Sequence, residues 1–268
     1  MKAFLKFSLI FMLGSCASSM NDNLNSTLWM QTAAEYQAST MQTYNTALAN
    51  VSRALNDKSW TAALEQTGEV SELPPAIILD VDETVLDNSA YEAKMIKEHG
   101  TFTPQSWDNW VHLQKAGAVP GAVDFINKVQ EMGVTAILLT NRACEKRQNS
   151  NAPCPQEDDT IENLKKAGIK NVSAETVLLK NEKDDWTSEK KSRRTFLAQK
   201  YRIIMLFGDD LGDFLADVKK NITPQQRAAL VEQYAQNWGT KWFVLPNPTY
   251  GSWYNVLQAP REQYLQDY

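Results

Sequence analysis

The chain has 268 residues, of which 43% are hydrophobic and 22% are charged, and its formal net charge at pH 7 is −5. This composition excludes a disordered or fibrous protein and predicts a globular chain built around one large core. Because the net charge is negative, the chain is a poor candidate for binding nucleic acid polymers.

The amino terminus has the layout of a short signal peptide, which we expect over residues 1–15. Lys2 and Lys6 precede an apolar run at residues 7–13. A membrane-spanning helix needs about 20 apolar residues, so this run is too short to be one.

Residues 13–16 read Leu-Gly-Ser-Cys and resemble the lipobox of bacterial lipoproteins, in which the chain is cleaved before the cysteine and the thiol is acylated. We therefore expect lipid on Cys16, a lipidated tether over residues 16–27, and no other attachment to the membrane. Ala17 stands where an aspartate often signals inner-membrane retention, so we expect a bacterial outer-membrane protein that faces the periplasm or the surface. The alternative is an ordinary signal peptide with an incidental cysteine.

Two further cysteines, Cys144 and Cys154, remain once Cys16 carries lipid. An exported protein folds where disulfide bonds persist, so we expect these two residues to pair. The alternative is two free thiols, which are reactive in an oxidising compartment.

Residues 28–64 contain alanine, leucine, tyrosine and tryptophan among polar residues without a proline, which predicts a helical flank extending over residues 28–73. The core is expected at residues 74–268. Four short apolar runs in it are typical of buried strands: residues 76–79, 134–139, 176–179 and 203–207. Segments with helical spacing lie between them: residues 121–132, 159–167 and 188–200. This alternation predicts an α/β fold with a parallel sheet between helices, whose ligands bind at the carboxyl ends of the strands.

Two carboxylates follow the first predicted strand, in the sequence D-V-D-E-T that begins at Asp80. Residues i and i+2 at a strand end can both face the ligand crevice. Asp80 would then attack phosphorus, while Asp82 would protonate the leaving alcohol and afterwards activate water. A bare pair of this kind also occurs in acidic turns and in simple metal sites. We expect Glu83, Asp87 and Asn88 to stabilise the turn rather than react.

Further polar residues follow the other predicted strands. Residues 140–142 read Thr-Asn-Arg after the second strand, and residues 208–213 read Gly-Asp-Asp-Leu-Gly-Asp after the fourth. A basic cluster, Lys-Lys-Ser-Arg-Arg, occupies residues 190–194. Phosphoryl transfer needs hydroxyl and amide donors for the phosphate oxygens, a cation for their charge, and carboxylates that hold a metal ion. All three occur here, which indicates a phosphoryl-transfer site.

Two other phosphatase chemistries are excluded by the same sequence. A histidine phosphatase needs Arg-His-Gly, whereas His99 and His112 lie in Glu-His-Gly and Val-His-Leu. A cysteine phosphatase needs an arginine six residues after its nucleophile, and neither Cys144 nor Cys154 has one there.

The ordered motifs from about residue 77 to residue 213 resemble those of the haloacid dehalogenase (HAD) superfamily of aspartate-based phosphatases. The stretch D-V-D-E-T-V-L-D-N at residues 80–88, the Thr-Asn-Arg and Gly-Asp-Asp-Leu stretches and the lipobox are similar to the lipoprotein-e group of class C acid phosphatases. The resemblance implies a Rossmann-like core with a small cap insert at about residues 86–120. It also implies Mg²⁺ as cofactor and small phosphomonoesters, nucleoside monophosphates above all, as substrates.

Several roles follow from this resemblance. Asp80 is expected to be the nucleophile and a Mg²⁺ ligand, and Asp82 the acid and base as well as a ligand through its main-chain carbonyl. Asp209 is expected to be the third protein ligand. Asp210 and Asp213 would orient ligands or water.

The phosphate itself is expected to meet Thr140, with Asn141 also contacting the substrate. For the phosphate-binding lysine, the K-x-x-R spacing of the group favours Lys191, with Lys190 and Lys180 as alternatives. The other interpretation of this basic cluster is a solvated helix face.

Two aromatic residues resemble the family's substrate slot. Trp107 lies 25 residues after Asp82, in an insert that also holds Trp110, and Tyr250 lies in the sequence P-N-P-T-Y-G. Each would stack on a base or phenyl ring. The alternative for any one of them is core packing.

Together these features predict a Mg²⁺-dependent acid phosphatase that acts through a phosphoaspartyl intermediate. The alternatives are a lipoprotein that binds a nucleotide without turnover, and a phosphotransferase that passes the phosphate to an acceptor alcohol. A simple binder needs neither a nucleophile nor a separate acid, so the enzyme is favoured.

Overall fold

The computed structural model describes residues 23–148 and 150–268. The expected signal peptide and the lipidation site at Cys16 lie outside these residues. Helix α1 (Leu24–Thr32) begins inside the segment expected to be a tether, so the folded part starts earlier than predicted. Among the described residues, no helix has both the length and the hydropathy needed to cross a bilayer.

The centre of the fold is a five-stranded sheet with the strand order β5-β4-β1-β6-β7, in which all pairs are parallel. The strands are β1 (Pro75–Leu79), β4 (Thr135–Ala143), β5 (Val177–Lys180), β6 (Arg202–Gly208) and β7 (Trp242–Val244). The predicted α/β fold class is confirmed, and four strands lie where the apolar runs placed them. Strand β7 was not predicted, because three residues are too few to show a pattern.

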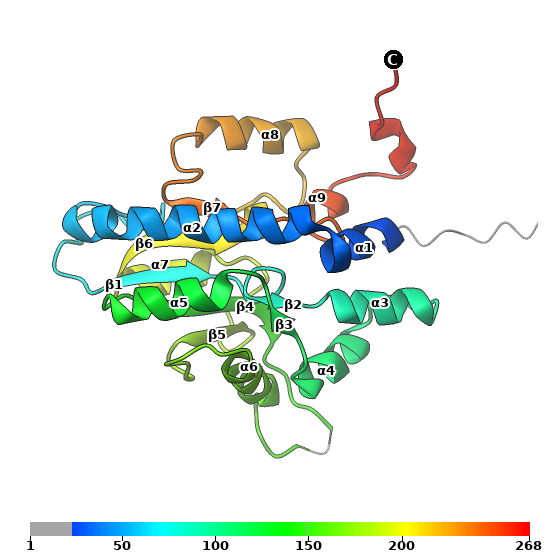
Figure 1. Ribbon diagram of the computed structural model, residues 1–268, viewed down its shortest axis with the longest axis horizontal. Helices are drawn as coiled ribbons and strands as arrows, with labels where there is room; N and C mark the ends of the chain where they lie inside the picture. Colours follow the sequence, from blue (N-terminus) through cyan, green and yellow to red (C-terminus); the bar gives the residue numbers. More distant parts are fainter. Residues whose placement is uncertain (1–22, 149) are drawn as a thin grey trace, which may run out of the picture.

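Helices cover both faces of the sheet (Figure 1). Side chains alternate along β1, so Ile77 and Leu79 pack in the core cluster formed with α2, α5 and α6, while Ala76 and Ile78 pack in the cluster formed with α7. The helices are α2 (Ala34–Asn56), α5 (Ala122–Glu131), α6 (Pro155–Lys166), α7 (Lys191–Ala198), α8 (Pro224–Gln233) and α9 (Ser252–Asn255).

The long helix α2 ends against a buried arginine of β6. The Arg202 guanidinium donates to the main-chain carbonyls of Ala54, Asp57 and Trp60, at 2.8, 3.0 and 3.2 Å. The last carbonyls of a helix have no partner within the helix, so a buried end needs such a donor. Arg202 thereby fixes the helical flank to the sheet.

The segment expected to be an insert forms a small cap. It contains the antiparallel pair β2 (Leu86–Asp87) and β3 (Gly117–Ala118), and between them helices α3 (Ser89–Lys97) and α4 (Pro104–Leu113). Helix α4 begins at a capping box of Thr103 and Ser106, with Pro104 in the first turn.

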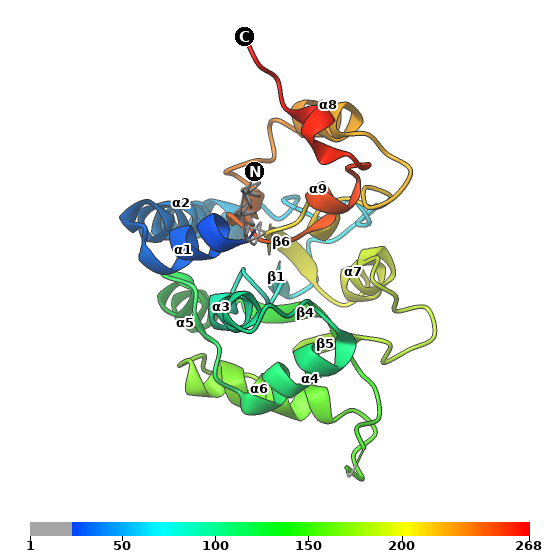
Figure 2. The same cartoon turned by 90° about the vertical axis from the view of Figure 1, so that its right-hand side faces the viewer.

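The strands run toward the end of the molecule where α1, α3 and α9 lie (Figure 1), and Figure 2 looks onto that end. Two short 3₁₀ helices complete the chain, η1 (Leu211–Asp213) after β6 and η2 (Arg261–Tyr264) near the carboxyl terminus. The carboxyl ends of β1, β4 and β6 therefore meet beneath the cap, which is where a doubly wound sheet binds its ligands.

Candidate active site

Asp80 is the first residue after β1, and its carboxylate forms an ion pair with the buried ammonium group of Lys190. The distance from Lys190 Nζ to Asp80 Oδ1 is 2.5 Å, and the same nitrogen lies 2.6 Å from Asp213 Oδ1. Lys190 stands at the amino-terminal boundary of α7 and is only 2% exposed. One cation is thus shared between the end of β1 and the loop after β6.

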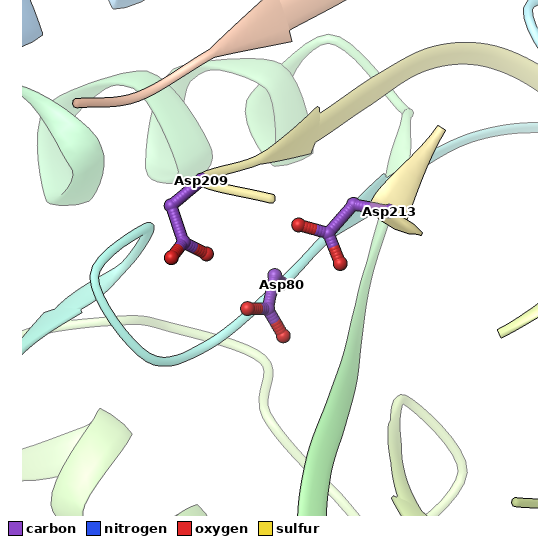
Figure 3. A group of neighbouring side chains, drawn as sticks. All are labelled: Asp80, Asp209 and Asp213. Atoms are coloured by element: carbon purple, nitrogen blue, oxygen red, sulfur yellow. The ribbon is translucent and has the colours of Figure 1, made fainter. Parts of the chain in front are cut away.

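Three carboxylates converge at this point (Figure 3). Oxygen atoms of Asp80, Asp209 and Asp213 all lie within 4.8 Å of one another. The pKa of Asp80 is raised to about 6, mainly by burial; the charge of Lys190 opposes this rise, and the charges of Asp213 and Asp82 add to it. Burial, followed by the charges of Asp80 and Asp213, raises the pKa of Asp209 well above its usual value.

This donor set fits a hard divalent cation. Carboxylate oxygens are the ligands that Mg²⁺ and similar ions prefer, and a cation among them would relieve the repulsion that, after burial, contributes to the raised pKa values of Asp80 and Asp209. Asp80 and Asp209 are the expected ligands that lie in this cluster. Asp213 was expected to orient the metal ligands or water, but one of its carboxylate oxygens lies in the cluster itself.

The loop after β6 is built around its own acidic residues. The Asp210 carboxylate accepts hydrogen bonds from the main chain of Gly212 at 2.7 Å and of Ser252 at 2.6 Å. Burial alone would raise the pKa of Asp210, but these bonds and the Ser252 hydroxyl outweigh it and lower the pKa. At Gly208 an added Cβ would lie 2.1 Å from the Asp213 carboxylate, so only glycine leaves room for Asp213 here.

Asp82 is held by a buried arginine that sequence reasoning left without a role. Arg142 Nη2 lies 2.7 Å from Asp82 Oδ1, and Arg142 Nε lies 3.0 Å from the same oxygen. Asn88 Nδ2 donates to Asp82 Oδ1 at 3.0 Å, and Thr140 Oγ1 lies 3.4 Å from Asp82 Oδ2. Asn88 also accepts from Trp110 Nε1 at 2.7 Å, which links the carboxylate to the cap. The sequence signal was an arginine in the polar Thr-Asn-Arg stretch that follows the apolar run of β4.

Two more buried arginines donate hydrogen bonds to the Thr-Asn-Arg stretch of β4 and to the loop after β6. Arg193 donates to the carbonyl of Thr140 and, at 2.6 Å, to the side-chain oxygen of Asn141. Arg194 pairs with Glu65 at 2.7 Å and donates to the carbonyl of Asp213 at 2.9 Å. Asn141 was expected to contact substrate, but its side-chain oxygen accepts a hydrogen bond from Arg193.

The lysine that reaches the site is Lys190, whereas Lys191 was expected; the K-x-x-R spacing fits both residues, because Arg193 follows Lys190 and Arg194 follows Lys191 by three positions. Lys191 is exposed on the first turn of α7, and among the described residues neither it nor Lys180 forms an ion pair with Asp80. Lys190 has the opposite environment: burial alone would lower its pKa, but Asp213 and Asp80 outweigh that effect and the pKa is raised. The lysine is therefore charged at the centre of the site.

The two expected stacking residues come from different parts of the chain. Trp107 lies on α4 and packs edge-on against Tyr91 within the cap, with 5.1 Å between ring centroids. Tyr250 lies in the loop before α9, and its hydroxyl donates to the carboxylate of Glu83, the residue after Asp82. Only Tyr250 is tied directly to the loop that carries Asp80 and Asp82.

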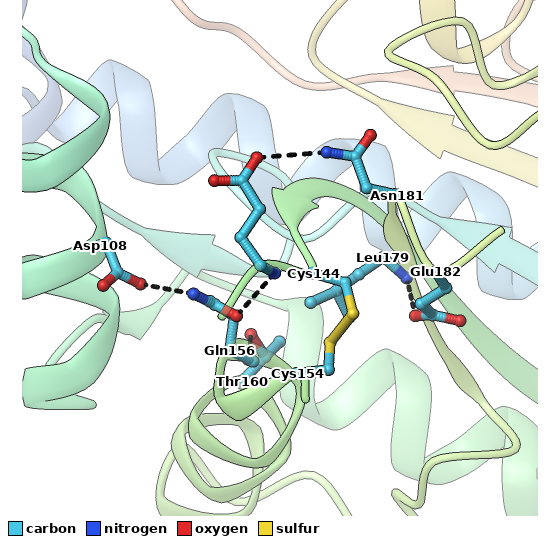
Figure 4. Close-up of a disulfide and its surroundings, with 9 residues drawn as sticks. Asp108, Cys144, Cys154, Gln156, Thr160, Leu179, Asn181 and Glu182 are labelled. Carbon is cyan, nitrogen blue, oxygen red and sulfur yellow. Dashed lines mark hydrogen bonds between the residues drawn. A yellow bond between two sulfur atoms is a disulfide. The ribbon is translucent and has the colours of Figure 1, made fainter. Parts of the chain in front are cut away.

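The predicted disulfide is confirmed, because Cys144 and Cys154 are bonded beside the end of β4 (Figure 4). Between them, Arg147 binds Asp108 of α4 through two hydrogen bonds of 2.8 Å and Asp159 of α6 at 2.7 Å. Gln156 also donates to Asp108, at 2.9 Å (Figure 4). The disulfide loop thus connects the cap to the core.

Known proteins resemble this chain along most of its length. The family model for HAD superfamily, subfamily IIIB acid phosphatases matches residues 11–253. A class C acid phosphatase from Bacillus anthracis has a similar structure, with a TM-score of 0.75 and 31% identity over 92% of this chain and 97% of that one. A second structure of that enzyme, with tungstate bound, gives the same values.

Two soybean (Glycine max) proteins are also related in sequence. The stem 28 kDa glycoprotein is 28% identical over 65% of this chain and 58% of its own length, and a stem 31 kDa glycoprotein is 26% identical over 74% and 67%. The chain therefore spans little more than half of the first of these relatives. With the sheet, the carboxylate cluster and the family match in agreement, the chain belongs to the acid phosphatase family of HAD superfamily subfamily IIIB.

Proposed function

We propose that this acid phosphatase hydrolyses small phosphomonoesters, nucleoside monophosphates above all, through a phosphoaspartyl intermediate on Asp80 and with Mg²⁺ as cofactor. The observation that carries the proposal is the position of Asp80. Its carboxylate lies at the carboxyl end of the central strand, 2.5 Å from a buried lysine and within the three-carboxylate cluster. A substrate phosphate there would meet a nucleophile and a cation together.

The reaction then divides between two aspartates. An oxygen of Asp80 forms a bond to phosphorus while the bond from phosphorus to the alcohol oxygen breaks, and Asp82 supplies the proton to that oxygen. Water next attacks phosphorus and gives a proton to Asp82, while the bond between phosphorus and the Asp80 oxygen breaks; this releases inorganic phosphate and restores the Asp80 carboxylate. Arg142 and Asn88 hold the Asp82 carboxylate in one orientation for both steps. Lys190 and the hydroxyl of Thr140 would bind the phosphate oxygens; their contacts with Asp80 and Asp82 support these roles.

Mg²⁺, when bound by Asp80, Asp209 and the main-chain carbonyl of Asp82, would neutralise charge on the phosphate. The oxygen-only donor set supports this choice. The tungstate complex of the similar Bacillus anthracis enzyme supports binding of a phosphate-like oxyanion, since tungstate is also a tetrahedral oxyanion.

Trapping of the intermediate tests the covalent step. The Asp82→Asn variant, whose second step lacks its base, is mixed with Mg²⁺ and p-nitrophenyl phosphate and quenched in acid, and its peptides are mapped by mass spectrometry. We expect a burst of p-nitrophenol together with a phosphoryl group on Asp80. Release of p-nitrophenol without phosphorylated Asp80 would show direct attack by water, and no turnover of any ester by the wild type would favour a nucleotide-binding protein. Phosphorylated product on addition of an acceptor alcohol would show phosphotransfer.

We also propose that the chain is a lipoprotein of the bacterial outer membrane, attached through Cys16. The Leu-Gly-Ser-Cys stretch followed by Ala17 supports this. The variant Cys16→Ala should move the enzyme from the membrane fraction to the soluble fraction without loss of phosphatase activity. Wild-type protein that takes up no labelled fatty acid would contradict the anchor.

A further inference from the structure

The side-chain amide of Asn88 lies between Asp82 and the cap and has a partner at each end. Asn88 Nδ2 donates to Asp82 Oδ1 at 3.0 Å, and Asn88 Oδ1 accepts from Trp110 Nε1 at 2.7 Å. The main-chain nitrogen of Asn88 donates to Glu83 Oε1 at 2.7 Å, and the residue is fully buried. The backbone is thus fixed, and only the direction of the amide is left to be set.

The indole of Trp110 sets this direction. A tryptophan Nε1 is a donor only, so it can bind the oxygen end of a primary amide but not the NH₂ end. An inverted Asn88 amide would place its NH₂ group against the indole N–H, and a buried donor without an acceptor is unfavourable. When Asp82 carries a proton, its own O–H could donate to the inverted amide. The indole N–H then opposes the inversion.

The two carboxyl oxygens of Asp82 have unequal surroundings. Besides the Asn88 amide, Oδ1 accepts from Arg142 Nη2 at 2.7 Å and from Arg142 Nε at 3.0 Å. Oδ2 has only longer contacts, 3.2 Å to Arg142 Nε and 3.4 Å to Thr140 Oγ1. An oxygen whose lone pairs already accept hydrogen bonds has less capacity for a proton. Oδ2 is therefore the oxygen on which Asp82 can carry a proton.

Trp110 is itself held by both the cap and the core. It lies on α4, packs against the core cluster and is next to Tyr91 of α3, with 6.4 Å between ring centroids. Asp108 lies two residues earlier on the same helix and pairs with Arg147 of the disulfide loop. One indole and one amide thus connect the position of the cap helix to the carboxyl group of Asp82.

We infer that Trp110 is a positioning residue for proton transfer: its indole N–H holds the Asn88 amide in one direction, which keeps Asp82 Oδ1 occupied and leaves Oδ2 to protonate the leaving alcohol. The inference rests on the proposed function, because it gives the cap a part in the same step. As the bond from phosphorus to the alcohol oxygen breaks, the proton on Oδ2 moves to that oxygen and Asp82 becomes a carboxylate. An inverted amide would instead hold the proton on Oδ1.

Two esters with the same ring test the inference. Phenol is a poorer leaving group than p-nitrophenol, so phenyl phosphate depends more strongly on protonation than p-nitrophenyl phosphate does. Trp110→Phe removes the indole N–H and keeps an aromatic ring. With excess enzyme and Mg²⁺, we expect the first-turnover release of phenol to slow about five- to tenfold, as the loss of one hydrogen bond predicts. Release of p-nitrophenol should slow less than about twofold, and the half-saturating concentrations should not change.

Further variants isolate the indole N–H. Asn88→Ala removes the amide itself, so adding Trp110→Phe to it should slow phenol release no further. Trp60→Phe is the matched control: it removes a buried indole N–H that donates to the main-chain carbonyl of Ile204 at 2.9 Å, and it should leave both esters unaffected. Melting temperatures show whether each variant folds. Benzothienylalanine in place of Trp110 has sulfur instead of the N–H, and it keeps the test decisive if Trp110→Phe does not fold.

The outcomes separate the inference from the proposed function. Equal slowing of both esters would show general damage to the site, and a raised half-saturating concentration at unchanged rates would show that Trp110 binds the leaving group. Either result, or additive losses in the double variant, would overturn the inference and leave the proposed function standing. Wild-type enzyme that hydrolyses neither ester would contradict the proposed function and the inference with it.

Discussion

Buried arginines hold the loops of this active site, although none of them takes part in the proposed bond changes. Arg142 binds the Asp82 carboxylate, Arg193 the carbonyl of Thr140, and Arg194 the carbonyl of Asp213. Each is at most 2% exposed. A guanidinium group has five donors in a rigid plane, so one residue can satisfy several buried acceptors at once. Geometry at the strand ends is therefore maintained by residues behind the reacting groups.

The neighbouring lysines Lys190 and Lys191 provide a matched pair at the residue scale. Lys190→Ala should lower kcat/KM for AMP roughly 10² to 10³-fold, because it removes a buried cation from the position of the phosphate. Lys191→Ala, on the exposed side of the same helix turn, should change kcat/KM by less than about twofold. Steady-state kinetics on both folded variants decide this, and a larger loss at Lys191 would contradict the geometry.

Two elements at the periphery of the sheet are each fixed by one arginine. Helix α2 ends on Arg202 of β6, and cap helix α4 is tied to α6 through Arg147 of the disulfide loop. In both cases an arginine from a neighbouring element donates hydrogen bonds. Arg202 donates to carbonyls at the end of α2, and Arg147 donates to carboxylates of α4 and α6. These contacts decide how the flank and the cap sit on the core, since helix propensity by itself does not orient a helix.

Arg202→Met should lower the free energy of unfolding by about 2 to 4 kcal/mol, because three carbonyls, two of them in buried hydrogen bonds, lose their donor. The active site is built from other loops, so kcat should stay close to that of the wild type. Denaturant unfolding measures the change. Lys58→Met, an exposed substitution just after α2, is the control and should cost less than about 0.5 kcal/mol. Equal effects of the two changes would show that Arg202 does not hold the helix end.

Arg147→Met should loosen α4 before the rest of the molecule, because two carboxylates on different helices lose their shared cation. We expect the free energy of unfolding to fall by about 2 kcal/mol. Relative to the wild type, amide hydrogen exchange should speed up more at residues 104–113 than in the rest of the chain. Lys146→Met, exposed in the same loop, should leave the exchange pattern unchanged. Uniform exchange across the whole chain in Arg147→Met would argue against a specific link to the cap.

Several carboxylates lie together at one end of the sheet, so the stability of the whole molecule depends on pH. Asp80 has a pKa of about 6 in the folded protein, raised mainly by burial from an ordinary value of 3.8. The folded state therefore holds this proton more tightly than the unfolded state does. The resulting contribution to stability is complete below about pH 4 and is lost as the pH rises through about 6.

Metal-free protein should show this loss directly. In EDTA, the stability of the wild type relative to Asp80→Asn should fall by about 3 kcal/mol between pH 4 and pH 8, because asparagine does not titrate. Millimolar Mg²⁺ at pH 8 should then stabilise the wild type more than the variant, since an ion that binds only the folded state raises its stability. Denaturant titrations at both pH values measure it. A pH-independent difference would place the titrating carboxyl group elsewhere.

The α/β class and the alignment of Asp80, Asp82, Thr140 and Asp209 with strand ends could be predicted from the sequence. The reason is that buried parallel strands leave short apolar runs, and all their carboxyl ends meet at one edge of the sheet. The disulfide was also predictable, because the chain offers a single pair of cysteines apart from Cys16.

Which of two adjacent lysines enters the site was decided only by the tertiary structure. Lys190 and Lys191 are chemically identical, and the rotation of α7 against β6 selects the one that turns inward. The partnership of Glu83 with Tyr250 had no local signal either, because it joins positions 167 residues apart. Local patterns determine which residues end a strand or start a helix, whereas packing of the whole chain determines which of their side chains meet.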